Sequence, residues 1–93
     1  MVVGVGTVDL FIPASRSLKE KRYVIKSVKD RIKNKFNVSV AEVDHQDKWQ
    51  RATLGIAQVS ENQQYIEETF QKVFSLIDQQ IEIQVLNRVI DYY

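Results

Sequence analysis

The chain contains no cysteine, and among its 93 residues it has one histidine, one proline and three glycines. Without cysteine it forms no disulfide and offers no thiolate to a metal ion. A single histidine also excludes a multi-histidine metal centre within one chain. No apolar run approaches the roughly 20 residues that cross a bilayer. Residues 1–10 have neither a basic leader nor a cleavage site, so we expect a strand there, and a cytoplasmic protein without a membrane partner.

The length predicts one small domain over residues 1–93, built around a single core. Hydrophobic residues make up 44% of the chain and charged residues 27%, as in an ordinary globular protein. No repeat, low-complexity tract or linker interrupts it.

Charge is unevenly distributed. The segment from Arg16 to Lys35 holds nine of the thirteen basic residues and only two acids, Glu20 and Asp30. Its net charge is therefore +7, and the rest of the chain carries −6, although the whole chain is only +1. Such a separation creates a local field that attracts an anionic partner.

Hydrophobic periodicity predicts six elements. Alternating or continuous apolar residues indicate strands, and apolar residues within one arc of a 3.6-residue wheel indicate helices. The order is strand, helix, strand, strand, helix, strand, with strands at residues 2–12, 38–44, 51–59 and 81–92, and helices after Ser17 and Ser60. This order predicts a ferredoxin-like α+β fold, with a four-stranded antiparallel sheet and both helices on one face. The first and third strands are then central, and Gly4 and Gly6 leave room for a helix to pack closely.

Helix ends are indicated by capping residues. Ser17 with Glu20 fits a capping box, and Ser60 with Gln63 repeats the signal at the second helix. Asn37 is the expected end of the first helix.

Three runs of sequence resemble a known family: SLKEKR at residues 17–22, NVSVAEVD at 37–44 and WQRA at 49–52. They are similar to the YlxP-like family of small uncharacterised bacterial proteins, and the resemblance covers essentially the whole chain. It implies the ferredoxin-like fold. The family's genes often lie near those for translation initiation and ribosome maturation, which implies a link to RNA or the ribosome. No catalytic residue set belongs to the family, so none is carried over.

The first helix carries a basic stripe, defined as Lys19, Arg22, Lys26, Lys29 and Lys33. Their spacing places all five within an arc about 80° wide, beside the apolar face. Such a row matches a phosphate backbone, so these residues are the candidate nucleic-acid-binding set. The alternatives are a solvated helix face, or neutralisation by Glu67 and Glu68 of the second helix.

The predicted third strand, residues 51–59, lacks aromatic residues, and the first strand offers only Phe11 near its end. Stacking of bases on the sheet is therefore not expected, and RNA would bind by its shape and phosphates.

The start of the first helix is a candidate anion site, because free amides there attract negative charge. Its candidate residues are Ser15, Ser17, Lys19, Lys21 and Arg22. Lys21 falls within the apolar arc, so we expect its amine to stay in solvent or to pair with a carboxylate such as Asp9.

The predicted second hairpin is dense in polar groups. Glu42 and Asp44, with His45 or Asp47, have the oxygen and imidazole groups for a divalent cation or for acid–base chemistry. The alternative is a solvated turn. Trp49 beside Arg51 is either an exposed contact anchor or an aromatic that closes the core over a helix end.

The final strand has a long apolar ending on an expected sheet edge. Its interaction candidates are Leu86, Ile90 and Tyr92, and a blurred alternation near Leu86 indicates a bulge or a second buried face. Exposed edges pair readily, so we expect a homodimer, joined either by strand pairing or by packing of the open sheet faces. A monomer guarded by its charged residues is the alternative.

No catalytic residues, metal ligands or cofactor are predicted, because no nucleophile–base pair and no P-loop is present. The leading hypothesis is an RNA- or ribosome-associated accessory factor. The alternative is a homo-oligomeric regulatory module that binds a small anionic metabolite at the first helix start or at a subunit interface.

Overall fold

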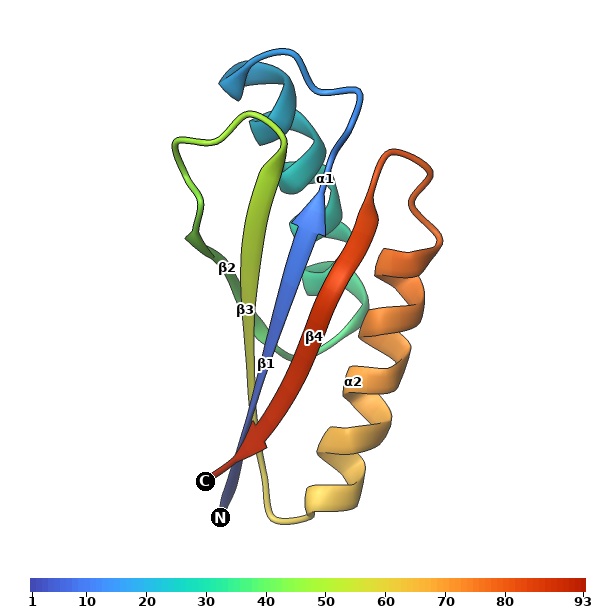
Figure 1. Cartoon of the computed structure of the whole chain (residues 1–93). Coiled ribbons are helices and arrows are strands. Elements are labelled where there is room, and N and C mark those ends of the chain that lie inside the picture. Colours follow the sequence, from blue (N-terminus) through green and yellow to red (C-terminus); the bar gives the residue numbers. More distant parts are fainter.

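A computed structural model describes all residues, 1–93. The elements follow the predicted order, with strands β1 (Val2–Phe11), β2 (Ser39–Asp44), β3 (Arg51–Ser60) and β4 (Gln84–Tyr92) and helices α1 (Leu18–Lys35) and α2 (Gln63–Asp78) (Figure 1). The strands form one antiparallel sheet in the order β2-β3-β1-β4. The ferredoxin-like prediction is confirmed, including the central position of β1 and β3.

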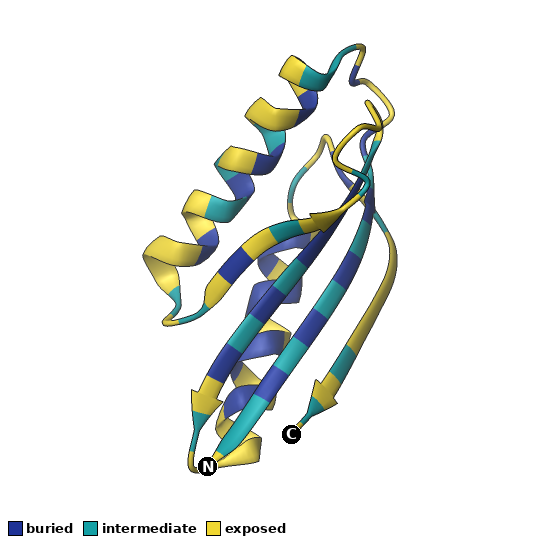
Figure 2. Cartoon of the chain, turned by 90° about the vertical axis from the view of Figure 1, so that its left-hand side faces the viewer, coloured by how far each residue is buried: buried dark blue, intermediate teal, exposed yellow.

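Both helices cover the same face of the sheet. Strand β1 buries every second residue against them, and its other residues face the open side (Figure 2). Helix α1 lies over β2, whereas α2 lies over β1, β3 and β4. One core of seventeen buried hydrophobic residues joins the two helices to the inner face of the sheet. Neither helix is long and apolar enough to span a membrane.

The two glycines of β1 allow α2 to pack closely against the sheet, as predicted. Both are buried, and a Cβ atom at Gly4 would collide with the Cγ2 methyl of Ile66. At Gly6 the nearest atom, on the Phe70 ring, would lie 3.6 Å from such a Cβ. Gly4 is therefore required for close packing, and Gly6 has space for a methyl group.

Helix α1 is capped at its start as predicted. The Glu20 backbone N–H donates to Ser17 Oγ at 3.1 Å, and the Glu20 carboxylate accepts from the Arg16 backbone N–H at 2.8 Å. The helix ends where expected: Phe36 is its C-cap in an extended conformation and donates its N–H to the Ile32 carbonyl, so Asn37 is the first residue beyond the cap.

The N-cap of α2 lies two residues after the predicted one, Ser60. Asn62 is the actual N-cap, and its side-chain oxygen accepts from the backbone N–H groups of Gln64 and Tyr65. The hydroxyl of Ser60 instead accepts from the Asn62 N–H at 3.1 Å. Ser60 therefore orders the turn that precedes the helix.

Two strands contain a bulge. In β4, Leu10 pairs with Val85 and Asp9 with Asn87, which leaves Leu86 without a partner on β1. The predicted bulge near Leu86 is confirmed. A second bulge at Val43 of β2 was not predicted.

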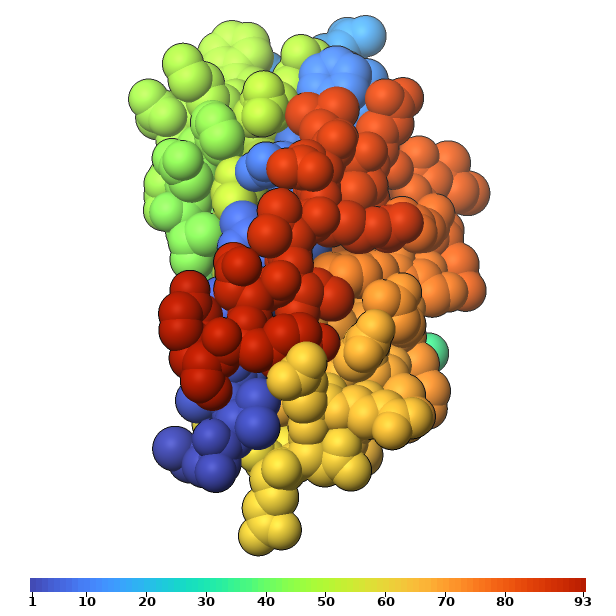
Figure 3. Space-filling view, turned by 60° about the horizontal axis from the view of Figure 1, so that its bottom comes forward, coloured from blue at the N-terminus to red at the C-terminus, as the bar shows by residue number.

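The two chain ends lie side by side. Val3 and Tyr93 exchange two backbone hydrogen bonds of 2.9 and 2.8 Å. The space-filling view shows the end of β4 directly beside the first residues of the chain (Figure 3). Strand β4 starts at Gln84, three residues later than predicted, because residues 81–83 form a turn that buries Ile83 and exposes Ile81.

Candidate nucleic-acid interface

The basic stripe lies on the outer side of α1. Lys19, Arg22, Lys26 and Lys33 are exposed, and Lys29 is half-buried. The last four residues of the stripe line one hollow of about 380 Å³ between α1 and the β2 edge, together with Asp30 and Glu42. The helix thus brings the five predicted residues together along one side.

Counter-charges around the stripe are few. Lys26 Nζ donates to Asp30 Oδ2 at 2.9 Å, and both side chains are largely exposed, so the pair adds little stability. The predicted alternative of neutralisation by Glu67 and Glu68 is wrong, because neither carboxylate forms an ion pair with any basic residue. The solvated-face alternative remains open.

The pKa of Asp30 reflects the positive charges of the stripe around it. Its pKa is lowered, chiefly by the hydrogen bond from Lys26; desolvation opposes this effect, and the positive charges of Lys26, Lys33 and Lys29 lower the pKa further. The pKa of Lys26 is raised by the same hydrogen bond and by the charge of Asp30. One carboxylate therefore lies within the field of three ammonium groups.

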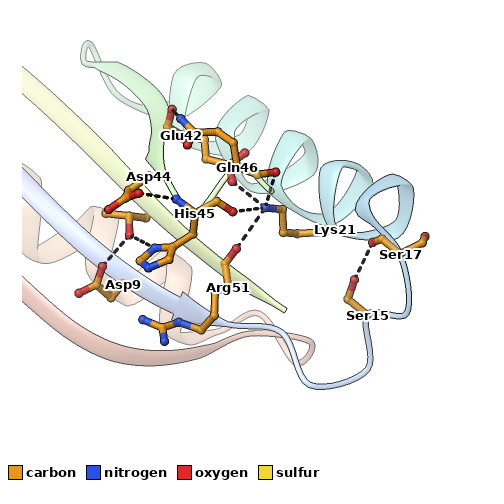
Figure 4. Close-up of polar contacts among 10 residues, drawn as sticks. Asp9, Ser15, Ser17, Lys21, Glu42, Asp44, His45, Gln46 and Arg51 are labelled. Atoms are coloured by element: carbon orange, nitrogen blue, oxygen red, sulfur yellow. Dashed lines mark hydrogen bonds and ion pairs between the residues drawn. The ribbon is translucent and has the colours of Figure 1, made fainter. Parts of the chain in front are cut away.

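Lys21 is the largest correction. Its side chain is fully buried, and its ammonium donates to Glu42 Oε2 at 2.9 Å and to the carbonyls of His45, Arg51 and Gln46 at 2.7, 3.1 and 3.3 Å (Figure 4). The expectation that this amine stays in solvent is wrong, and its partner is Glu42 instead of Asp9. The contact holds the β2–β3 hairpin against α1.

The predicted anion site has few free donors. Ser15 is buried and donates its hydroxyl to the Ser17 carbonyl at 3.1 Å, and Ser17 Oγ is engaged in the helix cap. Lys21 is enclosed by protein acceptors, so Lys19 and Arg22 are the remaining candidates. A metabolite site at the start of α1 consequently has less support than phosphate binding along the stripe.

The polar groups of the hairpin do not converge on one point. Glu42 binds Lys21, whereas Asp44 Oδ1 accepts from the His45 backbone N–H at 2.7 Å. That contact accompanies a left-handed backbone at His45, with φ of 63°. No three side chains of the ligand types His, Asp and Glu lie close enough to hold one metal ion.

The His45 ring belongs to a separate polar chain on the open sheet face. The Thr53 hydroxyl donates to Asp9 Oδ1 at 2.7 Å and lies 2.9 Å from His45 Nδ1. Because its single proton goes to Asp9, the hydroxyl oxygen accepts from Nδ1–H. These bonds join β1, β3 and the hairpin.

Trp49 does not close the core. It is 57% exposed, so the covered-core alternative is wrong. Its neighbour Gln50 ties the loop to the β1–α1 connection by donating to the carbonyls of Pro13 and Ser15. Arg51 is half-buried, and its Nε has no hydrogen-bond partner.

The interaction candidates on β4 divide into two groups. Leu86 is 51% exposed, whereas Ile90 and Tyr92 pack against the core and are only half-exposed. Partial burial, and secondarily Glu67, raises the pKa of Tyr92. The exposed apolar surface along this edge therefore consists of Leu86 and Val89 of β4 and of Tyr93, which directly follows the strand.

The sequence prediction missed Tyr23. This side chain is 78% exposed on α1, immediately beside the stripe. Its spacing of four residues from Lys19 and three from Lys26 is the signal that places it there.

The fold and this surface define a small ferredoxin-like α+β protein with one strongly basic helix. The chain belongs to the family described as "Protein of unknown function (DUF503)", which matches residues 3–90. It is 42% identical over 83 residues to "Uncharacterized protein YlxP" of Bacillus subtilis (strain 168), a match that covers 89% of this chain and 90% of that protein. The resemblance to the YlxP-like family is thereby confirmed.

Two solved structures were compared with the chain. A de novo designed protein with a ferredoxin fold is similar at a TM-score of 0.54 and 11% identity, over all of this chain and 83% of that one. A dimeric ferredoxin-like protein from an uncultured marine organism gives a TM-score of 0.44 at 10% identity, over all of this chain and 94% of that one. Only the first is close enough to support the fold, and neither bears on function.

Proposed function

We propose that the protein is a non-catalytic accessory factor that binds structured RNA, free or within a ribosomal particle, through phosphate contacts along α1. The observation that carries this proposal is the basic stripe. Five cations follow one side of a helix, and Asp30 is the one acid paired with them. A row of cations of which only one has an acidic partner attracts phosphates without reading the base sequence.

The dimensions of the stripe suit a duplex. Lys19 and Lys33 are fourteen residues apart, which is about 21 Å along a helix axis. A nucleic-acid duplex carries one charge per about 1.7 Å of axis, so several phosphates lie within reach of the five side chains.

The open face of the sheet argues against binding of single strands there. The register places Arg51, Thr53, Gly55, Ala57 and Val59 of β3 on that face, with no aromatic residue among them. Without a stacking platform, RNA recognition by shape and phosphates on α1 is favoured.

The experiment compares RNA binding by the native chain with a charge-reversed variant, K26E/K29E/K33E, by fluorescence anisotropy with an RNA hairpin at several salt concentrations. If four stripe residues contact phosphates, affinity falls about 100-fold between 50 and 200 mM salt. The variant should lose binding and most of the salt dependence.

The matched control is R31E/K35E/K72E, which changes the net charge equally but lies off the stripe. Its three side chains are exposed. We expect it to retain most of the affinity. Equal losses in both variants would show that only total charge matters, and they would contradict the proposed interface.

We also propose that the protein self-associates through β4. This strand is a sheet edge, and its residues Leu86 and Val89, with Tyr93 just beyond it, leave apolar surface exposed there. Sedimentation velocity should show a dimer that Leu86→Lys dissociates. Ile81→Lys, at a residue 98% exposed outside the strand, should leave the dimer intact. A native chain that is monomeric at every concentration would contradict this part of the proposal.

A further inference from the structure

A second hollow borders α1 on the side of Tyr23. It has a volume of about 410 Å³ and lies between the start of α1, the β1–α1 connection and the turn before β4. Ile12, which is buried, and Val24, which is half-buried, form its floor. Tyr23, Lys19, Glu20 and Glu82 form an exposed rim.

The rim has the chemistry of a nucleotide site. An exposed tyrosine ring, which here makes no hydrogen bond, is a surface on which a base stacks. Glu82 has no hydrogen-bond or ion-pair partner, and Glu20 uses only Oε2 in the helix cap. Carboxylate oxygens accept from the amino and imino N–H groups of bases.

Lys19 connects the hollow to the basic stripe. It lines the hollow and is the first residue of the stripe, so its ammonium can hold the phosphate of a nucleotide whose base enters the hollow beside Tyr23. The two carboxylates repel a phosphate at the rim, which leaves the base as the group that enters.

We infer that this hollow receives one unpaired base of the RNA whose duplex lies along the stripe, and that it favours guanine. Guanine presents N1–H and N2–H side by side, which suits a carboxylate acceptor, whereas uracil has no amino group. This inference rests on the proposed function. Its occupant is a bulged or looped nucleotide of RNA and not a free metabolite.

The test uses the full chain and four RNA hairpins with one stem: fully paired, or interrupted by a single bulged guanosine, uridine or abasic nucleotide. Fluorescence anisotropy at one salt concentration should show the guanosine bulge bound about 10-fold more tightly than the paired stem, as expected for one stacked base. The abasic bulge should give no gain, and the uridine bulge a smaller gain than guanosine.

Variants at Tyr23 separate stacking from charge. Tyr23→Ala should abolish the preference for the bulge and leave the affinity for the paired stem unchanged, whereas Tyr23→Phe should keep it. Because Tyr23 is exposed, neither variant should disturb the fold. Trp49→Ala, at the other exposed aromatic near this end of the molecule, is the control and should keep the preference.

The outcomes distinguish the two proposals. If the paired stem binds with the expected salt dependence but bulges add nothing, or if Tyr23→Ala retains the preference, the inference is overturned and the proposed function stands. If no stem binds, the proposed function fails. This inference then fails with it, because its occupant is a nucleotide of that RNA.

Discussion

Replacement of Lys21 by methionine tests how the hairpin is held against the helix. Methionine retains the unbranched shape of the lysine stem, with sulfur in place of one methylene, and lacks the ammonium group. Glu42, whose side chain is 15% exposed, then keeps a mostly buried charge without a partner. Three carbonyls, those of His45, Gln46 and Arg51, also lose a donor.

The expected cost is large for so small a domain. Removing one member of a buried ion pair costs about 3–5 kcal/mol, and each hydrogen bond to a charged group contributes about 1.5–3 kcal/mol. We expect Lys21→Met to lower the free energy of unfolding by about 4 kcal/mol, a large part of the about 5–15 kcal/mol typical of a domain. Urea denaturation, followed by circular dichroism and by the fluorescence of Trp49, measures this loss.

Two further variants make the result specific. Lys26→Met removes an ammonium from the same helix, but from a pair whose side chains are 75% and 52% exposed, so we expect no measurable change. Replacing both partners, as in K21M/E42L, should recover part of the loss because no buried charge remains. A Lys21→Met protein with the urea midpoint of the native chain would refute this account of the buried ammonium.

Two other predictions concern packing and charge. Gly4→Ala should destabilise the domain by about 1–3 kcal/mol because its methyl group meets Ile66, and Gly6→Ala should have a smaller effect; equal urea midpoints for the two variants would contradict the close contact. The pKa of the Asp30 carboxyl should lie below its ordinary value of 3.8 and rise in Lys26→Met, and an NMR titration with the same midpoint in both proteins would exclude the pairing. Because the pair is exposed, its contribution to stability is small; that contribution is present above the unfolded pKa and is lost as pH falls through the folded pKa.

The order of elements could be predicted because each element has a clear hydrophobic period. Residues of β1 alternate between the core and the open face, and the apolar residues of α1 fall within one arc. The start of α2 was predicted two residues early, because Ser60 and Asn62 are both good capping residues and the local sequence does not rank them. Only the chain path after β3 decides between them.

The details of the site depended on contacts between distant residues. Lys21 was correctly placed in the apolar arc, but its partner is 21 residues away, on a strand whose register changes at a bulge. No local pattern specifies that register. The exposure of Tyr23 and Trp49 likewise depends on how the helix and hairpin meet the sheet, which helical or strand periodicity alone does not determine.

The paired backbone of Val3 and Tyr93 has a topological consequence. Because the ends of the chain already meet, a short covalent linker would make the polypeptide circular without moving a strand. New ends could then be opened in the turn after α2, where Ile81 is exposed. Such a permuted protein would keep the basic helix and change only the sequence in which the strands are synthesised.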